Sequence, residues 1–204
     1  MLVRRDTHIF EKEQHGHYVE PAWCSQRLLE AEYFGPRGSL ILDPACGWGT
    51  ILRSALDAGF KAAGIDVVDR LQRNELKLDF AQFYKRDFLS EDKFPIWAPI
   101  QSIICNPPFD YVREFCERAI DLVESKVAMI MLLRRIPAAH WLNNLPLETI
   151  YMLSPRPSMP PGAWIAAGNK PGGGTQDFCF LVFNRQGRRS RYPSVKWLHR
   201  DSAT

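Results

Sequence analysis

The sequence predicts an α/β fold, with a doubly wound and mostly parallel sheet that carries helices on both faces. Two observations predict it. Short apolar runs of strand length alternate along the chain with longer segments whose apolar residues recur at helical spacing. Polar residues that suit ligand binding follow several of the apolar runs, where the carboxyl ends of parallel strands would meet.

The bulk composition suits one domain. The chain has 204 residues, 46% of them hydrophobic, which is enough for a single sizeable core. We expect residues 18–184 to form a single α/β domain, preceded by a flexible N-terminus, 1–17, and followed by a basic C-terminal tail, 185–204. Residues 185–200 hold six Lys/Arg and no acid. This tail is expected to be either a solvated end or an arm that binds a polyanion.

Cysteine usage and hydropathy favour a cytoplasmic protein without a membrane segment. The five cysteines are scattered and form no CxxC pair, so neither a disulfide framework nor a zinc site is predicted. No apolar stretch approaches the ~20 residues of a membrane helix. His8, His15 and His17 fall in the expected flexible end, and no metal site is predicted.

In the first half of the chain, a proline and later glycines bound a predicted helix at 22–34. Apolar runs at 39–42 and 61–66 predict strands. Between them, residues 50–59 have one apolar face and a terminal glycine, which predicts a helix. Three apolar residues at helical spacing predict another helix over 75–84.

In the second half, the apolar runs 101–105 and 126–133 predict strands around a helix at 112–123, which has six apolar residues at helical spacing. The remaining expected elements are a short helix at 138–145, a strand at 148–153, a loop at 154–176 and a strand at 177–184. Such a long loop is uncommon and often functional, so residues 154–176 are candidates for substrate contact.

The segment "LILDPACGWGT" joins the first strand to the next helix through a glycine turn. Gly47 and Gly49 would allow a ligand to approach the backbone closely. Asp66 ends the next strand, 23 residues after Asp43, where a carboxylate can accept hydrogen bonds from ribose hydroxyls.

The same turn disfavours phosphate-containing cofactors. A dinucleotide turn expects a third glycine, and Leu52 stands there instead. No Gly-Lys-Ser/Thr is present either. Asp43, just before the turn, would repel phosphate and would suit a cofactor with positive charge, such as the sulfonium of S-adenosylmethionine.

Two motifs in this order, "DPACGWG" at 43–49 and "NPPF" at 106–109, resemble those of class I S-adenosylmethionine-dependent methyltransferases. Within that family they are most similar to the compact phage-type or solitary DNA N6-adenine methyltransferases. The resemblance implies a Rossmann-like, seven-stranded, mostly parallel sheet whose last strand is antiparallel. It also implies S-adenosylmethionine as cofactor and transfer of its methyl group to the N6 amine of adenine in DNA.

The resemblance carries roles to individual residues. "GHYVEPAW" (16–23) is similar to the element that precedes the cofactor loop, with Glu20 where the family usually has Thr, and "YKRDFL" (84–89) is similar to the adenine-binding element. The implied cofactor-binding residues are Pro21, Asp43, Ala45, Gly47, Gly49, Asp66 for the ribose, and Asp87 and Phe88 for the adenine. The implied catalytic residues are Asn106, Pro107 and Phe109.

The Asn-Pro-Pro-Phe motif suits methylation of an aromatic amine. The lone pair of adenine N6 is delocalised into the ring, so the nitrogen must rehybridise before it can attack. The Asn106 side-chain oxygen and the Pro107 carbonyl can each accept one N6 hydrogen and stabilise the developing charge. Phe109 can stack on the base, worth ~1–3 kcal/mol. In a duplex the adenine must first be flipped out.

Other substrates and another class of protein stay open. RNA adenine methyltransferases carry the same tetrapeptide, and protein-glutamine methyltransferases carry a close variant. The "DPACG" form favours DNA over RNA as the nucleic-acid partner, whereas basic residues attract both. Arg134, Arg135 and Arg156 are candidates for phosphate contact. A non-catalytic module that binds the cofactor or nucleic acid is the remaining alternative.

Overall fold

A computed structural model describes residues 17–73, 77–78, 81–90, 98–187 and 192–201. The predicted flexible N-terminus, 1–17, therefore lies almost wholly outside the described residues, as do His8 and His15. Among the described residues, no helix combines the length and apolar content needed to cross a membrane.

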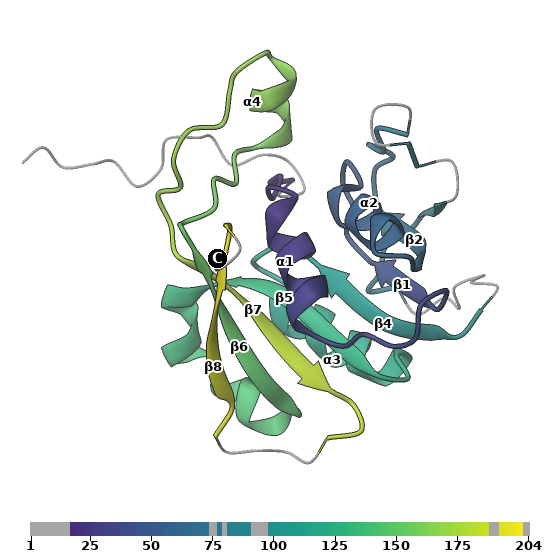
Figure 1. The fold of residues 1–204 in the computed structure, drawn as a ribbon, viewed down its shortest axis with the longest axis vertical. Coiled ribbons are helices and arrows are strands. Elements are labelled where there is room, and N and C mark those ends of the chain that lie inside the picture. Colours follow the sequence, from purple (N-terminus) through teal and green to yellow (C-terminus); the bar gives the residue numbers. More distant parts are fainter. Residues whose placement is uncertain (1–16, 74–76, 79–80, 91–97, 188–191, 202–204) are drawn as a thin grey trace, which may run out of the picture.

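One eight-stranded sheet organises the molecule (Figure 1). Its strand order is β3-β2-β1-β4-β5-β7-β6-β8. β7 is antiparallel to both of its neighbours, and every other strand pair is parallel. The strands are β1 Leu40–Asp43, β2 Lys61–Asp66, β3 Gln82–Lys85, β4 Ile100–Cys105, β5 Lys126–Leu132, β6 Leu147–Ser154, β7 Phe178–Asn184 and β8 Ser194–His199.

Helices cover both faces of the sheet. One core cluster packs α1 and α2 against one face, and the other packs α3 and two 3-10 turns against the opposite face. Side chains of a strand alternate between these clusters, as the period of two requires: Leu40 and Leu42 belong to one and Ile41 to the other. The helices are α1 Trp23–Ala31, α2 Thr50–Asp57, α3 Val112–Leu122 and α4 Gly162–Ala166, and the 3-10 turns are Leu133–Ala138 and His140–Asn144.

The α/β, mostly parallel, doubly wound fold is therefore confirmed, including the antiparallel strand predicted at 177–184. The sheet has eight strands, one more than the resemblance implied. The additional strand is β8, which pairs in parallel with β6. It lies within the segment that the composition marks as a basic tail.

The predicted helix over 75–84 is wrong in its described part. Residues 82–85 form β3, an edge strand that pairs in parallel with β2. Phe83 packs against one core cluster and Tyr84 against the other. The prediction of a helix rests on Leu76, Phe80 and Phe83, of which only Phe83 lies among the described residues, and so few apolar positions do not distinguish a helix from a short strand. The predicted helix at 138–145 is instead the 3-10 turn His140–Asn144, which follows another 3-10 turn, Leu133–Ala138.

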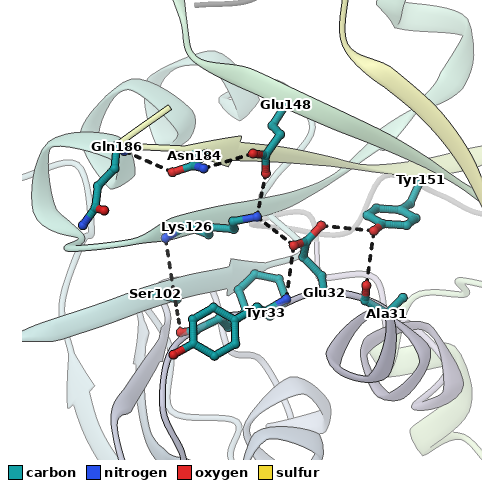
Figure 2. Close-up of polar contacts among 10 residues, drawn as sticks. Ala31, Glu32, Tyr33, Ser102, Lys126, Glu148, Tyr151, Asn184 and Gln186 are labelled. Atoms are coloured by element: carbon teal, nitrogen blue, oxygen red, sulfur yellow. Dashed lines mark hydrogen bonds and ion pairs between the residues drawn. The ribbon is translucent and has the colours of Figure 1, made fainter. Parts of the chain in front are cut away.

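A polar network joins the end of α1 to the amino-terminal ends of β5 and β6 (Figure 2). Lys126 Nζ lies 2.7 Å from Glu32 Oε1 and 2.6 Å from Glu148 Oε2. Tyr151 donates its hydroxyl hydrogen to Glu32 Oε2 at 3.0 Å, and Asn184 Nδ2 donates to Glu148 Oε1 at 3.0 Å. The network fixes the end of α1 to three neighbouring strands.

Candidate active site

A large cavity of about 1370 Å³ opens at the carboxyl edge of the parallel strands. Each strand from β1 to β5 contributes wall residues where it ends or just after it, and the segment between β6 and β7 forms the far wall. We call this segment, residues 155–177, the β6–β7 arm; it includes α4, which projects beyond the sheet in Figure 1. Six of the eleven predicted site residues line the cavity: Ala45, Asp66, Asp87, Phe88, Asn106 and Phe109.

The other five predicted residues support the wall without lining it: Pro21, Asp43, Gly47, Gly49 and Pro107. Gly49 has φ +94°, and a Cβ there would lie 2.6 Å from a methyl carbon of Leu78. Gly47 has φ +47°, and a Cβ there would lie 2.6 Å from His17 Nε2. In the structure, a side chain of the protein fills the space where a Cβ would stand: Leu78 at Gly49 and His17 at Gly47.

Asp66 connects the glycine turn to the cavity. Its Oδ2 accepts the backbone N–H of Gly47 at 2.9 Å, and its Oδ1 accepts the N–H of Val68 at 3.0 Å and a hydrogen from Arg70 at 3.3 Å. A carboxylate offers about four acceptor positions. Three are used, which leaves capacity for a ligand hydroxyl at the cavity wall.

Asp87 and Phe88 follow the edge strand β3 and differ in accessibility. Asp87 is exposed, and its Oδ1 accepts the N–H of Leu89 at 2.8 Å. Phe88 is only 2% exposed, and its ring centroid lies 5.0 Å from that of Phe115. Phe88 therefore belongs to the core as much as to the cavity wall, and Leu89, which sequence reasoning passed over, lines the cavity beside it.

Asn106 follows β4, and the nitrogen and the oxygen of its side-chain amide differ in their hydrogen bonding. Its Nδ2 donates one hydrogen to the backbone oxygen of Tyr18 and one to Glu20 Oε2, both at 2.9 Å. Its Oδ1 is buried and has no hydrogen-bond partner within the described part of the chain. Buried acceptors are normally satisfied, so an orphan oxygen at a cavity wall is a candidate ligand contact.

Phe109 stands beside Asn106 among aromatic rings. Its ring is nearly parallel to that of Tyr18, with centroids 6.0 Å apart and 16° between planes, and it is tilted against Phe178 at 5.8 Å. Arg135 donates to the Phe109 carbonyl oxygen, and its guanidinium lies 3.5 Å from Asp110. The segment after β4 is thus held rigidly at the cavity wall.

Two buried acids lie behind this wall. Burial raises the pKa of Glu20 to about 7, although its hydrogen bond from Asn106 opposes the shift. Burial also raises the pKa of Asp43 well above its usual value, and the nearby Glu20 charge adds to the effect. No ion pair within the described residues involves either carboxyl group. A cation bound near them would lower both pKa values and would itself be stabilised by the ionised carboxylates.

Basic residues occupy the other walls. Arg134 follows β5, and Lys170 lies on the β6–β7 arm; both line the cavity. Arg156, a predicted phosphate contact, instead pairs with Asp177 at the base of the arm, at 2.6 and 3.0 Å. Gly174 also packs against the base of the arm: a Cβ on it would lie 2.4 Å from the backbone oxygen of Arg156. Sequence reasoning did not single out Lys170, whose only signal was its place in a long loop.

Comparison with known proteins gives likeness of fold. No protein-family model and no curated protein matches the chain. A protein from Pyrococcus horikoshii assigned as an RNA methyltransferase superposes with a TM-score of 0.65 at 18% identity, over 86% of this chain and 91% of that one.

Two further solved structures show the same arrangement. The methyltransferase subunit of a type I restriction-modification system from Streptococcus thermophilus gives a TM-score of 0.59 at 12% identity, over 92% of this chain and 48% of that one, so this chain spans about half of it. Magnesium protoporphyrin IX methyltransferase from Synechocystis, solved with S-adenosylmethionine bound, gives 0.56 at 13% identity, over 81% and 78%. The chain therefore has the Rossmann-like methyltransferase fold.

Proposed function

We propose that the protein transfers a methyl group from S-adenosylmethionine to the exocyclic N6 amine of adenine in DNA. The observation that carries this proposal is the orphan Oδ1 of Asn106. Because both hydrogens of Nδ2 are already donated to Tyr18 and Glu20, the side chain can offer a substrate only an acceptor. A substrate with an N–H₂ group supplies the matching donor.

The residues present fit the proposed cofactor. Bound S-adenosylmethionine supplies an electrophilic methyl group on a positively charged sulfur. Asp66 has acceptor capacity for ribose hydroxyls, and Asp87 and Phe88 are proposed to hold the adenine. The buried carboxyls of Glu20 and Asp43, whose pKa values are raised by burial, favour a cation near the glycine turn. The Synechocystis methyltransferase, solved with the same cofactor, supports the assignment.

The chain's own groups then have separate tasks. Asn106 Oδ1 and the Pro107 carbonyl oxygen each accept one hydrogen of the amine, which orients the nitrogen lone pair and stabilises the charge that grows as the C–N bond forms and the C–S bond breaks. Phe109 stacks on the target base. The methylated amine is acidic, so it can lose its extra proton to water, and no general base is required.

Nucleic acid is the proposed polymer because the cavity combines an aromatic wall with cations. Phe109 and Tyr18 offer a stacking surface, while Arg134 and Lys170 can attract phosphate. DNA is preferred on the resemblance of the "DPACGWG" motif. Among the neighbours, the Pyrococcus protein is assigned as an RNA methyltransferase and the Streptococcus protein belongs to a restriction-modification system, so the fold alone does not choose the polymer.

The test is methyl transfer from labelled S-adenosylmethionine to duplex DNA, single-stranded DNA and RNA in parallel, with the product nucleosides identified. We expect N6-methyladenine in DNA. Asn106→Ala should lower the rate at least about 100-fold, because it removes a contact made in the transition state. Asn143→Ala, at an exposed asparagine in a 3-10 turn, is the matched control and should stay active.

Each other outcome overturns part of the proposal. Label in RNA alone moves the substrate to RNA and keeps the site. Label on a glutamine side chain moves it to protein. Cofactor binding without transfer to any polymer favours a binding module.

A further inference from the structure

Glu20 holds a position behind the proposed catalytic asparagine. It precedes α1, and it is 8% exposed. Its Oε2 accepts a hydrogen from Asn106 Nδ2 at 2.9 Å, although the two residues are 86 positions apart in the sequence. Glu20 itself does not line the cavity, so it reaches a substrate only through Asn106.

The two acceptors around Nδ2 decide which way the Asn106 amide faces. An asparagine side chain has two N–H donors on one atom and acceptor lone pairs on the other. Rotating the amide by half a turn would place Oδ1 against the Tyr18 oxygen, which cannot donate, and against Glu20 Oε2, which can donate only when protonated. With Glu20 ionised both hydrogen bonds would be lost, and a charge-assisted bond is among the stronger ones.

The surroundings of Glu20 give its carboxylate few other tasks. The ionisable groups that act on it or feel its charge are Asp43 at the end of β1, Cys24 on α1 and Cys105 at the end of β4. None of them is a cation. A buried carboxylate without a cationic partner costs stability, so packing alone does not account for a glutamate here.

We propose that Glu20 is a positioning residue for methyl transfer: its carboxylate takes one Nδ2 hydrogen of Asn106 and thereby keeps Oδ1 available as the acceptor for the substrate amine. This inference rests on the proposed function. It also assigns a role to the residue that stands where similar enzymes usually have a threonine. Glu20 acts on orientation, so its loss should lower the rate of transfer more than it weakens binding.

The kinetic test compares two substitutions of similar size. Glu20→Gln retains an oxygen that can accept from Nδ2, whereas Glu20→Leu removes every acceptor. In single-turnover transfer to adenine-containing DNA, we expect Glu20→Leu to lower the maximal rate constant at least about 10-fold, since small misplacements of reacting groups have such effects. Glu20→Gln should stay within about 3-fold of the wild type at neutral pH.

Glu32→Gln is the control for loss of a partly buried carboxylate. Glu32 lies in the network around Lys126, at the amino-terminal end of β5, and does not line the cavity. This variant should therefore be less stable, yet it should transfer methyl at the wild-type rate below its unfolding temperature. A Glu20→Leu variant as fast as the wild type overturns the proposal. So does a Glu20→Gln variant as slow as Glu20→Leu, because charge and not hydrogen-bond acceptance would then be required.

A second readout does not depend on turnover. In protein labelled at asparagine nitrogens, the Asn106 side-chain amide can be assigned by its loss in Asn106→Ser. We expect slow solvent exchange of both Nδ2 hydrogens in the wild type and in Glu20→Gln, and faster exchange in Glu20→Leu. If no polymer is methylated but this pattern holds, the proposed function fails while the positioning contact stands. If exchange is unchanged in Glu20→Leu, the positioning role fails whatever the substrate.

Discussion

At the scale of single residues, the carboxyl groups of Glu20 and Asp43 set the electrostatics of the site. Both are buried, and the pKa of each is raised chiefly by loss of solvation. Since burial disfavours the charged forms, a cation bound beside them would lower both pKa values and be stabilised in return. Neither carboxyl group has a cationic partner among the described residues, so a positively charged ligand would suit both.

This burial predicts an unusual pH dependence of stability without ligand. Glu20 has a pKa of about 7 in the folded protein against 4.5 when unfolded, so the folded state binds the proton more tightly. The contribution of Glu20 to the free energy of unfolding is greatest below pH 4.5. It falls by about 3 kcal/mol as the pH rises through 7. Asp43 acts in the same direction.

Urea unfolding between pH 5 and pH 8 measures this effect. The free energy of unfolding should fall as the pH rises, and in Glu20→Gln the decrease should be smaller because only Asp43 still contributes. Equal slopes for the two proteins would show that Glu20 does not titrate in this range.

Single residues were only partly predictable from the sequence. The proposed acceptor role of Asn106 rests on the chemistry of its motif, and in the structure its Oδ1 has no hydrogen-bond partner among the described residues. The groups that hold Nδ2, the Tyr18 oxygen and Glu20, come from a segment more than 80 residues earlier. Local patterns do not encode such long-range hydrogen bonds.

At the scale of elements, the network around Lys126 fastens α1 to the sheet. The Lys126 side chain is 13% exposed and lies between two carboxylates. Burial opposes both shifts, but the two carboxylates raise the pKa of Lys126, and hydrogen bonds from Asn184 and Lys126 lower the pKa of Glu148. The lysine therefore remains charged, and its removal would leave two carboxylates facing each other.

Lys126→Met should lower the free energy of unfolding by about 1–3 kcal/mol, between the values for exposed and for fully buried ion pairs, because the network is only partly buried. Urea unfolding at neutral pH measures the loss. The double variant Lys126→Met/Glu32→Gln should recover part of it, because it removes one uncompensated charge. A double variant that loses the sum of both single effects would contradict this account of the network.

The β6–β7 arm is the element expected to meet a polymer substrate. The Arg156–Asp177 pair fixes its base, and Lys170 lines the cavity from it while Arg134 lines it from the end of β5. Changing Lys170 and Arg134 together to Gln should weaken DNA binding and reduce the slope of log affinity against log salt by about 2.

Fluorescence anisotropy across a salt series measures that slope. Arg113→Gln, on exposed α3 surface outside the cavity, serves as the matched loss of one charge and should leave the slope unchanged. An unchanged slope in the double variant would remove both side chains from the DNA interface.

Elements with a strong pattern were predictable, whereas edge strands were not. The central strands are continuous apolar runs, buried on both faces. β3 and β8 each have a free edge; β3 is four residues long and β8 has one buried residue, so neither strand is a continuous apolar run. β8 contains Val195 and Trp197, which are exposed, and only Leu198 is buried. The basic residues of this segment predicted a tail, because amino-acid composition does not reveal that β8 pairs with β6.

At the scale of the whole molecule, stability should be concentrated in the centre of the sheet. β5 and β7 pair along seven residues, and β7 is buried over six of its seven. We expect hydrogen exchange to be slowest in β5 and β7 and faster in the edge strands β3 and β8. Exchange measured on peptides by mass spectrometry tests this, and equal protection of edges and centre would contradict it.

The molecular plan as a whole was largely predictable. Alternation of strands and helices gives the parallel sheet, and parallel strands place their carboxyl ends at one edge, where Asp66, Asp87 and Asn106 line a common cavity. The glycines of the turn were expected to admit a ligand. In the structure they admit His17, Leu71 and Leu78, contacts that depend on how distant segments fold back.

The position of β7 has a consequence for synthesis of the chain. β7 is made after β5 and β6 but lies between them, so those two strands do not pair directly with each other. Until residue 184 has emerged from the ribosome, each retains an unpaired apolar edge, and the next segment to appear is itself "FCFLVFN". Such edges promote association between chains. We therefore expect a nascent or truncated chain that stops before Phe178 to need a chaperone or to aggregate.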